Sequence, residues 1–199
     1  MHRPPTLATL ILATAFLAGC GTSPPSRFYT LDATATAAAA VSAPSGLVIA
    51  VGPVTVPAIV DRPEFVVSAG PNEVKIDDFN RWASPLQDGL SRAVAENLVA
   101  LLGTPRVVRY PQPLAIEADY RVVIEVRTFD SAPGQSAALD AVWTIRRSKD
   151  GRTQTGRTSV RDPVPDKGYD ALAAAHSRAV ARMSQDIANA IAAMQRSAG

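Results

Sequence analysis

Ser84-Pro85-Leu86-Gln87 has the residue pattern of a helix start: a serine N-cap, a proline at the first helical position and a glutamine that completes a capping box. Apolar residues then recur at helical spacing and give the segment one largely apolar face. These residues are Leu86, Leu90, Ala93, Val94, Leu98 and Leu101, with Asn97 among them. Gly103, with Pro105 beyond it, supplies the stop signal. The pattern predicts a helix from about Pro85 to Leu102.

Short strand patterns precede this helix. Leu47–Val51 is a continuous apolar run of the length expected for a strand buried on both faces. Pro53 and Pro57 follow, and we expect them to prevent a regular central strand there. Phe65–Val67 and Glu73–Ile76 form two further short strands. The turn signal Gly70-Pro71-Asn72 separates these two strands.

Longer strands and a second helix follow the first helix. The three strands are Tyr120–Phe129, Ala137–Arg147 and roughly Arg152–Val160, and the turn Lys149-Asp150-Gly151 makes a hairpin of the last two. A second apolar stripe at helical spacing runs from about Tyr169 to Gln195. These elements predict an α+β fold: a single domain in which a mainly antiparallel sheet packs against two long helices.

The N-terminus has the layout of a secretory signal peptide, with a basic start at His2 and Arg3 and an apolar core from Leu7 to Phe16. This core is shorter than the roughly twenty residues that cross a bilayer. Leu17-Ala18-Gly19-Cys20 then resembles a bacterial lipobox, whose cysteine is lipidated and becomes the first mature residue. The alternative is an ordinary signal peptide that happens to end near a cysteine.

This interpretation divides the chain into a signal peptide over residues 1–19, a lipidated tether with one short strand over 20–46, and an α+β periplasmic domain over 47–199. Arg27–Leu31 is the short strand. Asp32–Gly46 is rich in Ala, Thr, Ser and Pro, and we expect a flexible linker there. Gly21 follows the cysteine in place of the aspartate that retains bacterial lipoproteins in the inner membrane, which favours the outer membrane.

Charge and composition argue against several functions. The formal net charge is only +2, so the chain has no basic excess of the kind that nucleic-acid binding needs. The single cysteine would be used by the lipid, which leaves no thiol for disulfides or catalysis. The sequence has no phosphate-binding loop, no metal-ligand spacing and no nucleophile elbow. We therefore expect no metal, no cofactor and no enzymatic activity.

A single histidine of the predicted mature chain, His176, is the main candidate for catalysis. It lies on the apolar side of the second helix, with Ser177 and Asp170 nearby in sequence. Ser177 is its immediate neighbour on a helix and so points elsewhere. We expect a histidine at the margin of the core rather than a general base. Likewise, Asp77 and Asp78 fit loop and cap residues better than a catalytic carboxylate pair.

Two segments are candidates for binding a partner protein. In Val51–Phe65, prolines stiffen the backbone and Asp61-Arg62-Pro63-Glu64 places charge on a rigid corner. In Phe79–Ala83, Arg81 and Trp82 immediately precede the first helix. Arginine and tryptophan dominate binding hot spots, so Arg62, Glu64, Arg81 and Trp82 are the predicted contact residues. Packing of Trp82 against the helix start is an equally good interpretation, and both can hold.

The order of these segments resembles one lipoprotein family. Phe28-Tyr29-Thr30-Leu31, the stretch 51–65 with Asp61-Arg62-Pro63, and Arg81-Trp82-Ala83 with Pro85-Leu86 are similar to the PqiC/YmbA family. These are auxiliary lipoproteins of ABC-type, MCE-associated lipid transport systems. The resemblance covers nearly all of the predicted mature chain and includes Cys20. The chain departs from the family at Phe28 and at Ile59-Val60, where we expect tyrosine-containing pairs.

The resemblance implies a non-catalytic, periplasm-facing outer-membrane lipoprotein whose partner is the MCE-domain protein of a PqiB-like transporter. It is also compatible with a homo-oligomer. One rival is a structural lipoprotein of another outer-membrane assembly machine. A second is a lipid-anchored hydrolase, which would depend on His176. A solute-binding lipoprotein is a weaker rival, because a two-lobed clamp needs a longer chain.

Overall fold

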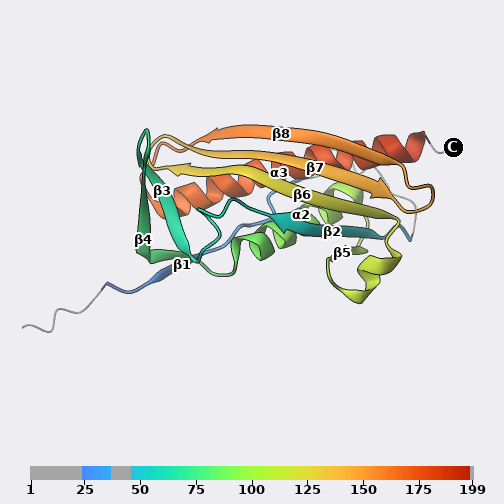
Figure 1. The fold of residues 1–199 in the computed structure, drawn as a ribbon, viewed down its shortest axis with the longest axis horizontal. Helices are drawn as coiled ribbons and strands as arrows, with labels where there is room; N and C mark the ends of the chain where they lie inside the picture. The colour runs from blue at the N-terminus through green and yellow to red at the C-terminus, as the bar shows by residue number, and fades with distance from the viewer. Residues whose placement is uncertain (1–23, 37–45, 198–199) are drawn as a thin grey trace, which may run out of the picture.

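A computed structural model describes residues 24–36 and 46–197. They form an α+β domain in which two long helices pack against β-sheet (Figure 1), as the sequence predicts. The strands divide into two sheets, and each contains parallel as well as antiparallel pairs. In chain order the elements are β1 (Arg27–Tyr29), β2 (Ile49–Thr55), β3 (Glu64–Gly70), β4 (Glu73–Trp82), α2 (Leu86–Leu102), β5 (Val107–Arg109), the 3₁₀ helix η2 (Pro113–Glu117), β6 (Tyr120–Ala132), β7 (Ser136–Arg147), β8 (Thr153–Pro163) and α3 (Tyr169–Arg196).

The larger sheet has five strands in the order β5-β2-β6-β7-β8. Strands β6, β7 and β8 form the predicted antiparallel meander, whereas β2 pairs in parallel with both β5 and β6. Helix α3 packs on β7 and β8, and α2 packs on β2 and β5. Both helices lie behind this sheet in Figure 1, so its other face is open.

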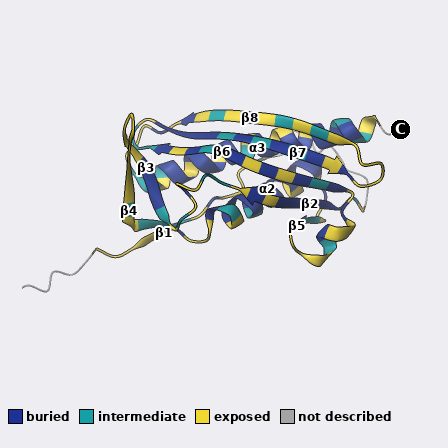
Figure 2. Ribbon diagram, viewed as in Figure 1, coloured by how far each residue is buried: buried dark blue, intermediate teal, exposed yellow. Residues whose placement is uncertain are grey.

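Strand β6 shows how the sequence pattern sets the two faces. Val122, Ile124 and Val126 are buried under the helices, while Val123 and Glu125 are exposed on the open face. Figure 2 shows this alternation of buried and exposed residues along the strand. Successive side chains of a strand point to opposite faces, so alternation in sequence becomes a two-faced sheet.

Strand β2 is longer than its predicted apolar run, because it continues through Pro53 to Thr55. Its pairing with β5 ends at Val51, and its register with β6 shifts between Val51 and Val54, with Pro53 exposed within this irregularity. The prediction that the strand is not a regular central one at Pro53 is therefore confirmed, since a proline lacks the N–H donor and is tolerated at such a bulge.

The smaller sheet has the order β1-β4-β3. Strands β3 and β4 form a hairpin around the predicted turn at Gly70–Asn72, and both extend beyond their predicted ends. Strand β1 adds to β4 in parallel, with Tyr29 opposite Trp82. Figure 1 shows this sheet at one end of the elongated molecule, across from the end where β6 and β8 begin.

Helix α2 begins and ends almost where the sequence predicts, but not by the predicted mechanism at its start. Pro85 occupies the N-cap and no side chain caps the first turn. The prediction of a capping box formed by Ser84 and Gln87 is therefore wrong. The C-terminal prediction is confirmed: Gly103 adopts the left-handed conformation at φ 65°, and its N–H donates to the Val99 carbonyl. Glycine reaches this region without the steric cost of a side chain.

Residues 32–36 contradict the expected flexible linker where the structure describes it. They follow Leu31, which is buried in the core. The N–H of Asp32 donates to Ser177 Oγ over 3.0 Å, and the N–H of Ala35 donates to the buried Asn97 Oδ1 over 2.9 Å. Polar side chains of both helices therefore fix a segment that has few apolar residues of its own. Residues 37–45 of the predicted linker lie outside the described residues.

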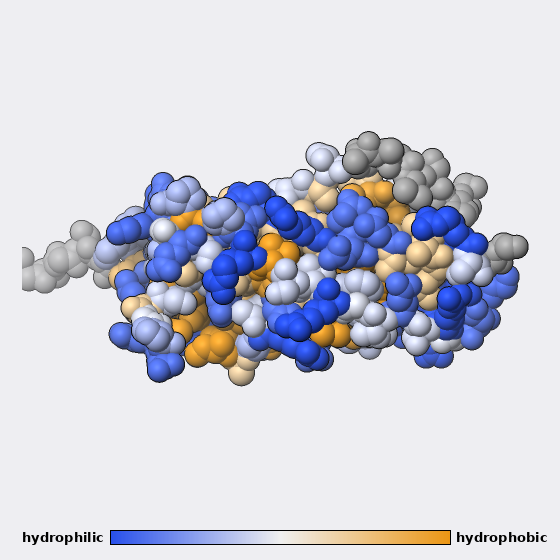
Figure 3. Space-filling view, turned by 90° about the horizontal axis from the view of Figure 1, so that it is seen from above, coloured by the Kyte–Doolittle hydropathy of each residue, from blue (hydrophilic) through white to orange (hydrophobic). Residues whose placement is uncertain are grey.

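The helices of the described chain pack within the domain. Among them, none is both long enough and apolar enough to cross a bilayer. Figure 3 shows mostly hydrophilic side chains on the face seen from above, interrupted by small apolar patches.

Candidate functional site

The two segments that the sequence predicts as contact surfaces meet in the fold. The backbone N–H of Trp82 donates to the carbonyl of Pro63 over 2.7 Å, and Glu64 pairs with Arg81 in the β3–β4 ladder. The register of this ladder shifts at Glu64, because the next residue, Phe65, pairs with Asp77. This bulge brings the two segments together. Arg62, Glu64, Arg81 and Trp82 thus lie close together in what we call the β3–β4 corner, although Trp82 itself is largely buried.

Glu64 and Arg81 form an ion pair at this corner, with Arg81 Nη2 donating to Glu64 Oε1 over 2.5 Å. The two side chains are 18% and 36% exposed, so solvent screens the pair only in part. The corner therefore contains a fixed ion pair, and one buried N–H donor of Arg81, at Nε, has no partner among the described residues.

The Trp82 side chain belongs mainly to the core. It is 6% exposed and stacks on Phe65, with ring centroids 4.2 Å apart. Phe129 and His176 meet the Trp82 ring edge-on, at centroid distances of 6.0 and 6.4 Å. Tyr169 meets the other ring of the stack, Phe65, at 5.3 Å. This aromatic cluster joins the smaller sheet to α3, which fixes the position of the corner.

The edge of Trp82 also lines a shallow pocket of about 410 Å³. The pocket is lined by Asp61, Arg62, Pro63, Trp82, Ala83, Ser84 and Pro85. Its walls are mainly proline, alanine and indole carbon, and the Nε of Arg62 is buried without a partner among the described residues. The pocket can accept an apolar group, while Arg62 supplies a donor for an anion or carbonyl beside it.

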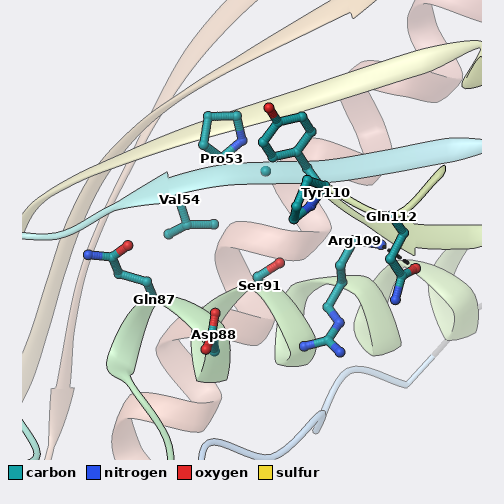
Figure 4. Close-up of a pocket in the computed structure, with 10 residues that line it drawn as sticks. Pro53, Val54, Gln87, Asp88, Ser91, Arg109, Tyr110 and Gln112 are labelled. Atoms are coloured by element: carbon teal, nitrogen blue, oxygen red, sulfur yellow. Dashed lines mark hydrogen bonds between the residues drawn. The ribbon is translucent and has the colours of Figure 1, made fainter. Parts of the chain in front are cut away.

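A second pocket of about 360 Å³ adjoins this corner and was not predicted from the sequence. It lies between the irregular part of β2, the first turns of α2 and the end of β5. In Figure 4, Asp88 and Ser91 of α2 and Arg109 of β5 line it, below Pro53. Gln87 links the two pockets, because its Nε2 donates to Asp61 Oδ2 over 3.2 Å. The only sequence signal was Pro53, which marks the bulge that opens this space.

His176 lies deeper than the sequence suggests: it is fully buried rather than at the core margin. Its ring stacks on Phe129 with centroids 3.8 Å apart, and its Nε2 shares a 2.8 Å hydrogen bond with Ser131 Oγ. Burial lowers the pKa of His176 to about 3, despite an opposing effect of Asp162. Nδ1 has no partner among the described residues, so no carboxylate orients the ring as in a triad.

Asp77 has a structural role, but within strand β4 and not in the loop or cap that the sequence predicts. It accepts hydrogen bonds from the N–H groups of Phe79 and Asn80 and from the Tyr169 hydroxyl. Burial alone would raise the pKa of Asp77, but these hydrogen bonds lower it to about 2. Asp78 is exposed. The two carboxylates therefore act separately, and Asp77 fixes the bulge of β4. Among the described residues no group of His, Asp or Glu is arranged to hold a metal ion.

Comparison with known proteins identifies the family. Over residues 29–188 the sequence matches the ABC-type transport auxiliary lipoprotein component family, and the chain belongs to it. A comparison with curated protein sequences gives no significant match. The lipidation residue Cys20 lies outside the described residues.

Solved structures confirm the fold. Protein XCC0632 from Xanthomonas campestris, of the DUF330 family, superimposes with a TM-score of 0.70 at 23% identity, covering 87% of this chain and all of that one. A crystal structure described as an uncharacterized protein gives 0.69 at 21% identity, covering 84% and 99%. The PelC dodecamer from Paraburkholderia phytofirmans is more distant, at 0.39 and 12% identity over 74% and 92%.

Proposed function

We propose that this protein is an outer-membrane lipoprotein, anchored through Cys20, that acts as a non-catalytic auxiliary subunit of an MCE/ABC-type lipid transport system. The family supplies the transport-auxiliary role. The observation that carries the finer proposal is the convergence of the predicted contact residues on one corner. Arg62 and Trp82 line an apolar pocket there, and Glu64 and Arg81 form the ion pair of the same corner. A rigid aromatic site with partly buried charge is typical of protein contact surfaces.

The position of the β3–β4 corner constrains the partner. Residues 21–26 separate Cys20 from β1, and an extended chain covers at most roughly 3.6 Å per residue, so β1 lies within roughly 25 Å of the anchor. The corner is joined directly to β1, since the N–H of Ala83 donates to the Tyr29 carbonyl over 2.8 Å. A partner at this corner must therefore reach close to the outer membrane, as a trans-envelope MCE-domain protein would.

The test is an affinity pull-down of the protein from envelope membranes, with Cys20→Ala alongside. We expect the wild type to recover an MCE-domain protein and Cys20→Ala to recover less of it, because the lipid raises the local concentration of the two partners. Recovery of outer-membrane assembly factors without an MCE-domain protein would refute the proposal and favour the assembly-machine alternative. Fractionation of Cys20→Ala into the soluble periplasm would test the anchor itself.

A further inference from the structure

Two arginines face each other across strands on the open face of the larger sheet. Arg121 of β6 is directly opposite Arg146 of β7 in the antiparallel ladder. Both lie on the face away from the helices, because the neighbouring Val122 and Ile145 are buried beneath α2 and α3. Directly opposite side chains have Cβ atoms roughly 5 Å apart, so two guanidinium groups there repel each other unless an anion lies between them.

Two other arginines of this face are neutralised by carboxylates, whereas Arg161 of β8 forms no ion pair and donates to Ser136 Oγ over 2.9 Å. Arg127 pairs with Glu125 over 3.3 Å, and Arg157 pairs with Asp140 over 2.6 Å. No ion pair within the described residues includes Arg121 or Arg146. The hydrogen bond found for the Arg121 side chain is a long one of 3.3 Å to the Ala115 carbonyl. Arg121 and Arg146 thus form a like-charge pair without a carboxylate partner, on a face where Arg127 and Arg157 each have one.

A pocket of about 420 Å³ lies at this pair. Its lining is Arg121, Val123, Thr144, Arg146, Ser148 and Thr153. Three of these residues carry hydroxyl groups. Ser148 donates its hydroxyl to the Ala118 carbonyl and Thr144 shares a hydrogen bond with Thr155, so Thr153 adds the neutral donor beside the two guanidinium groups. The strands of the sheet form its floor, so the arginines are presented by rigid backbone and not by a loop. The pocket lies at the end of the molecule where β6 and β8 begin, away from the β3–β4 corner (Figure 1).

We propose that Arg121 and Arg146 form a binding site for a phosphate-class oxyanion. Guanidinium groups recognise phosphate through paired N–H donors, and two of them on adjacent strands can hold one anion from both sides. The anion removes the repulsion that the register imposes. This site is independent of the β3–β4 corner and of the proposed partner, and it takes either free phosphate or the phosphate of a lipid headgroup.

The experiment is isothermal titration calorimetry on the full chain, purified from membranes in a neutral detergent. Inorganic phosphate is titrated against chloride at matched ionic strength, and mixed micelles of phosphatidic acid are the second arm. Arg121→Gln and Arg146→Gln should each weaken binding about tenfold or more, the loss expected for one charged hydrogen-bonding group. Arg127→Gln and Arg157→Gln on the same face are the matched controls and should bind as the wild type does.

Thermal unfolding supplies a second readout that a merely structural role would not produce. Without ligand, Arg146→Gln should raise Tm by about 1–3 °C, because it removes the repulsion. With phosphate it should lose the ligand-induced rise that the wild type shows.

Binding of phosphate alone would identify a free anion, and binding of phosphatidic acid alone would identify a headgroup. The absence of binding in both arms would overturn the proposal, as would an equal loss of affinity in the control variants.

Discussion

The N–H of Trp82 donates to the Pro63 carbonyl over 2.7 Å, and this bond joins two segments that are separate in sequence. It places Trp82 beside Arg62 at the pocket of the β3–β4 corner. The same residue stacks on Phe65 in the core, so the proposed contact surface and the aromatic core share one side chain.

Trp82→Ala should therefore act mainly on stability. Loss of a buried indole ring leaves a cavity and costs about 3–5 kcal/mol of unfolding free energy. Trp82→Phe retains a stacking ring and should cost markedly less. Urea unfolding of both variants measures the difference. An Ala variant as stable as the Phe variant would show that the stack with Phe65 contributes little.

The ion pair of the corner allows binding to be separated from folding. Arg81→Glu places two carboxylates together and should destabilise the domain by about 1 kcal/mol. The double variant Glu64→Arg/Arg81→Glu restores an ion pair with the charges exchanged, so its stability should return toward the wild type. Its recovery of the partner in a pull-down should stay low, because the charges presented at each position are reversed. If the double variant recovers as much partner as the wild type does, binding of the partner does not depend on the sign of the charge at these two positions.

His176 should make stability depend on pH. Its folded pKa of about 3 lies below the unfolded value of 6.5, so between these values only the unfolded chain gains the proton. Stability is therefore complete above pH 6.5 and falls with decreasing pH, at a slope that approaches about 1.4 kcal/mol per pH unit. Asp77 contributes a further loss, but only as the pH falls below about 4 toward 2.

Urea unfolding at pH 7.0, 6.0, 5.0 and 4.5 isolates the histidine. His176→Gln has no titratable group and keeps a hydrogen-bonding partner for Ser131, so its stability should vary less over this range. Parallel curves for the two proteins would mean that His176 is protonated in the folded state, contrary to its full burial.

Asn97 should hold the N-terminal segment on the helices. It is fully buried, accepts from the Ala35 N–H, and its Nδ2 donates to Ser184 Oγ over 3.3 Å. Asn97→Ala leaves the Ala35 N–H without its partner, while Ser184 keeps its bond to the Val180 carbonyl, and should cost about 1–3 kcal/mol. Hydrogen exchange should then accelerate over residues 31–36 while β6 and β7 stay protected. Equal protection of the segment in both proteins would show that Asn97 does not fix it.

The sequence predicts the elements that are set by local periodicity. Helix α2, helix α3 and strands β6 to β8 all carry an apolar pattern over many residues, and Gly103 ends α2 as expected. Local periodicity does not encode contacts between segments that are far apart in the sequence. The Asn97 bond to Ala35 makes a structured segment of an Ala- and Thr-rich stretch, and the parallel pairing of β2 depends on strands that come much later in the chain.

The sequence predicts which residues contact a partner, but not how these residues are arranged in space. Arg62, Glu64, Arg81 and Trp82 were singled out because of their types and their rigid neighbours, but the β3–β4 bulge that unites them depends on long-range pairing. The Arg121–Arg146 pair was missed for the same reason, since strand register decides which charges face each other.

We propose that the β3–β4 corner contacts an MCE-domain protein near the outer membrane. The most direct measurement is photo-crosslinking in intact cells with p-benzoyl-phenylalanine in place of Ala83, which is exposed and lines the pocket. Thr155, exposed on the open face of β8, is the matched control position. A crosslink to an MCE-domain protein from position 83 and not from position 155 is the predicted result. The absence of such a crosslink from position 83, or an equal yield from both positions, would show that the β3–β4 corner does not contact this partner.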